Sequence, residues 1–112
     1  MINTIIHSNK TSWGNVWHII TDDGKGHIAA SIENENEDTI FLYGLSVIPE
    51  VRNHGIGKAL ICFAENLGIQ YNKTRCRLNV EKPKSWLYDF YIKLGYEYWD
   101  EDDEYYYLVK YL

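Results

Sequence analysis

The segment best suited to bind an anion lies between an apolar strand and an amphipathic helix. It reads Arg52-Asn53-His54-Gly55-Ile56-Gly57-Lys58. The first N–H groups of a helix have no acceptor within the helix, and the helix dipole adds partial positive charge at the same end. Glycines at 55 and 57 let an anion lie on the backbone, while Arg52 and Lys58 add positive charge. The segment therefore predicts a diphosphate site.

Two better-known phosphate motifs do not fit this segment. A Walker A loop requires Gly-x-x-x-x-Gly-Lys-Ser/Thr, but Ala59 follows Gly57-Lys58 and Arg52 stands at the first glycine position. The dinucleotide-binding Gly-x-Gly-x-x-Gly motif lacks its third glycine, because Leu60 stands there. On these residues alone, a tight strand-to-helix turn that binds no ligand remains the alternative interpretation.

Hydrophobic periodicity predicts the elements that must position this segment. We expect strands over 2–7, 13–21, 27–32, 39–47, 75–80, 96–99 and 105–112, helices over 56–67 and 83–94, and a connection over 8–12. The strand, helix and strand from 39 to 80 form a crossover, which favours a parallel pair. Gly95 stands where a helix commonly ends on a glycine.

Side-chain patterns along these elements predict what is buried. The expected apolar face of the first helix comprises Ile56, Ala59, Leu60, Phe63, Ala64 and Leu67, and that of the second comprises Trp86, Leu87, Phe90, Tyr91 and Leu94. The tryptophans expected in the core are Trp13, Trp17, Trp86 and Trp99. Cys62 and Cys76 belong to no CxxC pair, so we expect two free buried thiols. His7, His18 and His27 lack metal-ligand spacing, and no metal site is expected.

Composition excludes several classes of function. The chain has 112 residues, 46% of them hydrophobic, and a net charge of -5. It fits one globular domain spanning 1–112 and lacks the basic stripe of a nucleic-acid-binding protein. No apolar run approaches 18 residues, and the N-terminus lacks the features of a signal peptide. We therefore expect a cytoplasmic protein that binds neither membrane nor nucleic acid.

Two motifs resemble those of the GNAT superfamily of N-acetyltransferases. The first is the stretch from Gly44 to Leu60, including Pro49-Glu50, and the second is Asp89-Phe90-Tyr91-Ile92-Lys93-Leu94-Gly95-Tyr96. They occur in the family's order with a strand between them, and the resemblance covers roughly residues 39 to 99. It implies an α/β (α+β) fold with a mixed, mostly antiparallel central sheet and two main flanking helices. The sheet would splay between its fourth and fifth strands, with acyl-CoA in the gap.

The resemblance also implies roles for individual residues. Backbone groups of Leu45 and Val47 would hold the pantetheine and the acyl carbonyl. The amides of Arg52, Asn53, His54, Gly55, Ile56, Gly57 and Lys58 would hold the pyrophosphate. Tyr91 matches the tyrosine that often protonates the departing CoA thiolate. The implied reaction is acetyl transfer from acetyl-CoA to a primary amine, on a small molecule or a protein, without a metal.

The sequence also departs from the family pattern. Lys84 stands where an asparagine commonly contacts the cofactor, and Asn79 is not at the matching place. Phe41 aligns with a glutamate that sometimes serves as base. The remaining candidates are Glu33, Glu35 and His54, or water alone, and we assign none of them. The two helices that normally wall the acceptor site do not fit within 8–12.

These departures leave three hypotheses. The first is N-acetyl transfer from acetyl-CoA. An open acceptor face then suits a protein side chain or N-terminus, although a homodimer partner could close it. The missing base and asparagine favour a non-catalytic acyl-CoA-binding or interaction module. A nucleotide-binding regulator using the same anion turn is the third.

Overall fold

The computed structural model describes residues 4–12, 14–33, 37–52 and 55–112. Its elements are β1 (Thr4–Thr11), β2 (Gly14–Thr21), β3 (Gly26–Ile32), β4 (Thr39–Val47), the 3-10 helix η1 (Pro49–Val51), α1 (Ile56–Gln70), β5 (Arg75–Glu81), α2 (Ser85–Lys93), β6 (Glu97–Glu101) and β7 (Tyr105–Tyr111). The sheet order is β1-β2-β3-β4-β5-β7-β6. β4 and β5 are parallel and the other neighbouring pairs antiparallel, so the predicted parallel pair is confirmed.

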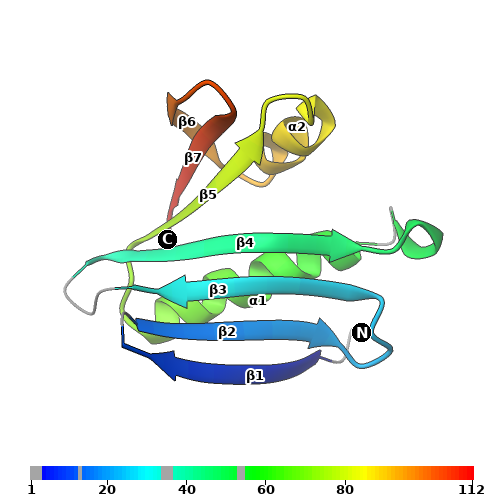
Figure 1. Cartoon of the computed structure of the whole chain (residues 1–112), viewed down its shortest axis with the longest axis vertical. Helices are drawn as coiled ribbons and strands as arrows, with labels where there is room; N and C mark the ends of the chain where they lie inside the picture. Colours follow the sequence, from blue (N-terminus) through cyan, green and yellow to red (C-terminus); the bar gives the residue numbers. More distant parts are fainter. Residues whose placement is uncertain (1–3, 13, 34–36, 53–54) are drawn as a thin grey trace.

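The sheet divides into two blocks that separate between β4 and β5. Thr39 to Leu42 pair with Arg75 to Leu78, and no pairing is found beyond Leu42 and Leu78. Figure 1 shows β5 turning away from β4 so that β5, β7, β6 and α2 lean away from β1–β4 and α1. The expected splay is therefore confirmed, and the C-terminal ends of β4 and β5 do not pair with each other.

Helix α1 packs on one face of the β1–β4 block, where two glycines permit close approach. A Cβ on Gly26 of β3 would lie 2.8 Å from Ile56 Cγ2, and one on Gly68 of α1 would lie 2.7 Å from Ile40 Cγ2. The helix continues past Gly68 to Gln70, beyond its predicted end. It is closed by Asn72, whose φ of 61° is left-handed, and by the Lys73 N–H donating to the Gly68 carbonyl.

Helix α2 is shorter than expected and is centred on a different side chain. It begins at Ser85 rather than at Pro83, and Gly95, with φ 99°, follows it as predicted. Its buried residue is Tyr91, whereas Trp86 is 62% exposed, contrary to prediction. Trp86 lies five residues from Tyr91, which places it about 140° around the helix axis.

Several other sequence predictions are wrong. β1 continues through the expected connection to Thr11, because its polar residues 8–10 can lie exposed on an edge strand. Leu60 and Ala64 of the predicted α1 face are buried, but Ile61 and Glu65 are buried beside them, and Cys62 and Phe63 are exposed instead. Trp99 is exposed at a register shift of edge strand β6. Trp17 is buried as expected, and Trp13 lies outside the described residues.

A buried polar cluster ties α1 to the second block of the sheet. The Tyr96 hydroxyl lies 2.8 Å from Glu65 Oε2 and 3.1 Å from Cys76 Sγ. Lys110 Nζ lies 3.1 Å from the same Glu65 oxygen. Because a carboxylate only accepts, the Tyr96 proton goes to Glu65 and the Cys76 thiol donates to the hydroxyl oxygen. The cluster compensates a buried charge with an ion pair and a hydrogen bond.

The two thiols should differ in reactivity. Burial raises the pKa of Cys76 to about 12, so it stays protonated below that pH and unreactive, whereas Cys62 is exposed. We expect one equivalent of fast reaction with Ellman's reagent at pH 8 in the native protein and two in denaturant. Cys62→Ser should abolish the fast equivalent and Cys76→Ser should preserve it; the reverse pattern would contradict this burial.

Removing the Tyr96 hydroxyl should destabilise the protein. Tyr96→Phe leaves the buried Glu65 carboxylate with Lys110 but without its hydroxyl donor, which should cost about 1–3 kcal/mol of unfolding free energy. The matched control is Tyr98→Phe, because the Tyr98 hydroxyl bonds Glu101 at the exposed surface. Urea unfolding followed by circular dichroism measures both variants. Equal midpoints would show that the cluster contributes nothing.

Candidate functional site

The site begins at the unpaired half of β4. Leu45 and Val47 lie beyond the last β4–β5 pair, on the splayed length of the strand where the sequence placed them. A strand whose neighbour has turned away presents free N–H and C=O groups along that edge. An extended polar chain can add to such an edge through backbone hydrogen bonds. The geometry therefore suits a pantetheine-like group, although that role remains a prediction.

A β-bulge at Gly44 changes the direction of this edge. Tyr43 pairs with Ala29 and Ser46 with His27, so β4 has one residue more than β3 over the same length. Gly44 takes up the extra residue with a φ of 66°, a conformation that side chains disfavour. This bulge was not predicted from the sequence, although a lone glycine within a strand pattern is a signal for one.

The turn after β4 directs a helix N-terminus toward the gap. Gly55 precedes α1 with φ 79°, and no side chain caps the helix there. The first-turn amides of Ile56, Gly57 and Lys58 lack intrahelical acceptors and can meet an anion. A Cβ on Gly55 would find no atom within 4 Å, so the space beside the turn is open. Asn53 and His54, also predicted to contribute, lie outside the described residues.

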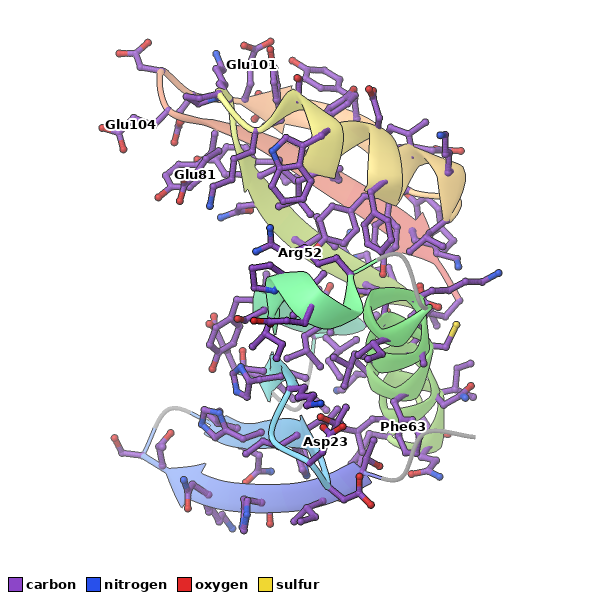
Figure 2. All side chains as sticks on the ribbon, turned by 90° about the vertical axis from the view of Figure 1, so that its right-hand side faces the viewer. Asp23, Arg52, Phe63, Glu81, Glu101 and Glu104 are labelled. Carbon is purple, nitrogen blue, oxygen red and sulfur yellow. The ribbon has the colours of Figure 1, made fainter. Side chains whose placement is uncertain are left out.

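Arg52 has a structural contact as well as a charge. Its Nε donates to the Val47 carbonyl at 2.9 Å, and its backbone N–H donates to Pro49. Figure 2 shows Arg52 between α1 and α2, at the level where the two blocks separate. The bond fastens the turn to the end of β4. It keeps the exposed guanidinium close to the start of α1, where the sequence predicted an anion.

The other helix reaches the same place from the second block. A Cβ on Gly57 would lie 3.4 Å from Phe90 Cζ and 4.0 Å from Leu45 Cδ2. Gly57 belongs to α1, Phe90 to α2 and Leu45 to β4, so the three elements converge at the mouth of the split. Glycine at 57 thus keeps this convergence free of a side chain.

Tyr91 stands on the inner face of α2, next to this convergence. Its ring contacts Phe90 and Tyr96, with centroids 5.3 and 5.6 Å away. Its hydroxyl makes no hydrogen bond to the described residues. In these residues, every side-chain oxygen that is fully buried has a hydrogen-bond partner. The hydroxyl therefore reaches accessible space. Burial, and secondarily Cys76, raise the pKa of Tyr91 well above its usual range, so it stays protonated and can donate.

The positions that depart from the family pattern have other partners. Lys84 is exposed and lies 3.5 Å from Glu81. The Phe41 ring lies under the Arg77 guanidinium, whose carbon is 5.4 Å from the ring centroid. Neither position supplies the expected amide or carboxylate. Glu33 is exposed, and its charge contributes with burial to a raised pKa of Tyr43 on the splayed strand.

The described residues contain neither a candidate metal site nor a membrane-spanning helix. Within 4–12, 14–33, 37–52 and 55–112, no group of three or more His, Cys, Asp or Glu side chains could hold a metal ion. Neither helix in this part of the chain has the length and hydrophobicity to cross a membrane.

Comparisons with known proteins agree with this geometry. Residues 12–98 match the family model described as "Acetyltransferase (GNAT) domain". The chain is 31% identical over 103 residues to "Uncharacterized N-acetyltransferase YesJ" of Bacillus subtilis, covering 91% of this chain and 47% of that protein. It thus spans about half the length of this curated relative.

Solved structures give the same fold. PaiA N-acetyltransferase from Thermoplasma acidophilum, in complex with coenzyme A, superposes with a TM-score of 0.75 at 26% identity, covering 87% of this chain and 60% of that one. A GNAT family acetyltransferase from Elizabethkingia anophelis with acetyl-CoA bound gives 0.77 at 12% identity, covering 98% and 99%. At that identity the second likeness shows the fold alone. With the split sheet, the free helix N-terminus and the family match together, the chain belongs to the GNAT acetyltransferase family.

Proposed function

We propose that this chain is an acetyl-CoA-dependent N-acetyltransferase domain that transfers an acetyl group to a primary amine. The observation that carries the proposal is the position of the uncapped α1 N-terminus beside the unpaired half of β4. A diphosphate on the amides of Ile56, Gly57 and Lys58 would place the attached pantetheine along Leu45 and Val47. Coenzyme A bound to PaiA N-acetyltransferase supports this choice of ligand.

The reaction follows from this placement. The neutral amine attacks the thioester carbonyl carbon, a C–N bond forms, and the C–S bond breaks. The Leu45 N–H stabilises the negative charge that develops on the carbonyl oxygen. The amine loses a proton to water, and Tyr91, whose raised pKa keeps its hydroxyl protonated, gives a proton to the departing sulfur. The products are an acetylated amine and CoA.

Charge and exposure favour a cationic acceptor on a protein or peptide. Glu81, Asp103 and Glu104 line an open hollow of about 570 Å³, together with Lys82, Pro83 and Tyr105. Figure 2 shows Glu81, Glu101 and Glu104 gathered at that end of the second block. Among the described residues, no helix lies between β1 and β2 to wall the sheet. A wide acidic surface suits a lysine side chain better than a small amine that needs enclosure.

A non-catalytic acyl-CoA-binding module is the second candidate. It is favoured by Lys84, which is paired with Glu81, and by Phe41 in place of a carboxylate. This module would bind CoA and release no thiol. A panel of lysine peptides and small amines with acetyl-CoA separates the two candidates, because only the enzyme releases CoA in proportion to acetylated product.

Adding a side chain at the anion turn should weaken CoA binding. Gly55→Ala strains a left-handed residue by about 1–2 kcal/mol and tilts the first amides of α1. We expect the dissociation constant for CoA, measured by calorimetry, to rise at least about tenfold. Gly24→Ala is the matched control, because Gly24 has φ 74° and open space around it but lies in the β2–β3 hairpin. Equal loss in both variants, or in neither, would contradict the assignment of the turn.

Removing the Tyr91 hydroxyl should slow turnover without weakening CoA binding. Loss of a general acid commonly costs about two to four decades in rate, so Tyr91→Phe should lower kcat by that amount. Because the pKa of Tyr91 is raised, its ionisation should cause no loss of wild-type activity up to about pH 10. Tyr88→Phe on the same helix is the control, since its ring packs on Tyr106. An unchanged kcat in Tyr91→Phe would exclude the role.

A further inference from the structure

Two histidines form a hydrogen-bonded chain that ends on the bulge of β4. His18 Nδ1 of β2 lies 3.0 Å from His27 Nε2 of β3, and His27 Nδ1 lies 3.1 Å from the Gly44 carbonyl oxygen. The rings are 5.3 Å apart between centroids and inclined by 22°. The chain joins three neighbouring strands through side chains, at the one place where β3 and β4 lose their regular register.

The carbonyl at the end of this chain fixes the tautomers of both rings. A carbonyl oxygen only accepts, so His27 Nδ1 must carry a proton. In neutral His27 the other nitrogen, Nε2, then accepts, and its donor must be the Nδ1–H of His18. Both rings therefore point their N–H groups in one direction, from His18 through His27 to Gly44.

This bond constrains the neighbouring amide. The Gly44 C=O and the Leu45 N–H belong to one trans peptide and point in opposite directions. When the carbonyl turns toward His27 on β3, the Leu45 N–H turns away from β3, to the side of β4 that β5 has left. Donation to the carbonyl also polarises the peptide and makes its N–H a stronger donor. A glycine at φ 66° has no side chain to hold this peptide by packing.

We propose that His27, oriented by His18, is a positioning residue that aims the Leu45 N–H at the thioester carbonyl of the bound acyl-CoA. The inference rests on the proposed function, since it concerns the charge that develops during acyl transfer. His27 acts through the Gly44–Leu45 peptide and makes no contact with the substrate. The interaction matters most in the transition state, because the carbonyl oxygen carries its largest charge there.

Kinetics of matched histidine variants test the proposal. His27→Phe should lower kcat about 10- to 100-fold. This loss should not exceed the loss of kcat that follows removal of a complete oxyanion-hole donor. The KM for acetyl-CoA should change less than about twofold, and CoA affinity should not change, because CoA has no acyl carbonyl. His27→Asn should recover most of kcat, since its side-chain amide can donate near the position of Nδ1.

The control is His7→Phe. His7 pairs with His18 in the β1–β2 ladder, but its side chain makes no hydrogen bond or ring contact among the described residues. It should leave kcat and KM unchanged. An unchanged kcat in His27→Phe, or equal losses in His27→Phe and His27→Asn, would overturn the proposal. If His27 had only a structural role, His27→Phe would lower thermal stability and CoA affinity together with kcat.

Nuclear magnetic resonance gives a readout independent of turnover. Ring ¹⁵N spectra should show His27 protonated at Nδ1, and the Leu45 amide proton should shift in His27→Phe but not in His7→Phe. A His27 ring protonated only at Nε2 would overturn the inference even in an active enzyme. If the wild type binds CoA but acetylates nothing, the proposed function fails, and these spectra alone decide whether His27 positions Leu45.

Discussion

The end of β4–β5 pairing at Leu42 and Leu78 is the constraint on which the rest of the structure depends. Before that point the two strands satisfy each other's backbone groups. Beyond it, β4 is held by β3 and α1, and β5 by β7, so each strand follows its own block. The free edge leaves backbone groups of β4 available to a ligand, whereas a fully paired parallel strand would have none to offer.

The other features of the site take their places around this free edge. The Gly44 bulge turns one peptide of β4, and the His27 ring holds its carbonyl. Arg52 ties the following turn to Val47, which brings the uncapped start of α1 to the end of the same strand. Phe90 of α2 closes the arrangement from the second block, against Gly57. The anion site, the backbone donor and the proton donor that we propose thus all lie around one strand.

The two blocks of the sheet diverge at one end but must stay joined elsewhere. The Glu65, Tyr96, Cys76 and Lys110 cluster connects α1 to the second block through buried polar contacts, below the level of the split. Tyr96 also packs edge-on against Tyr91, so the same cluster supports the tyrosine that we propose as proton donor. Such contacts are directional, and they can fix an angle between layers where apolar packing alone would tolerate sliding.

The sequence by itself determined the order of strands and helices, the parallel pair, the glycine turn and the position of Tyr91, because these follow from local periodicity and turn chemistry. It misjudged Trp86, Trp99 and Cys62, since burial depends on how far each helix or strand is covered by another layer. Only the tertiary structure brought His18 and His27 to the Gly44 carbonyl, because cross-strand register, and not spacing along the chain, decides which side chains meet.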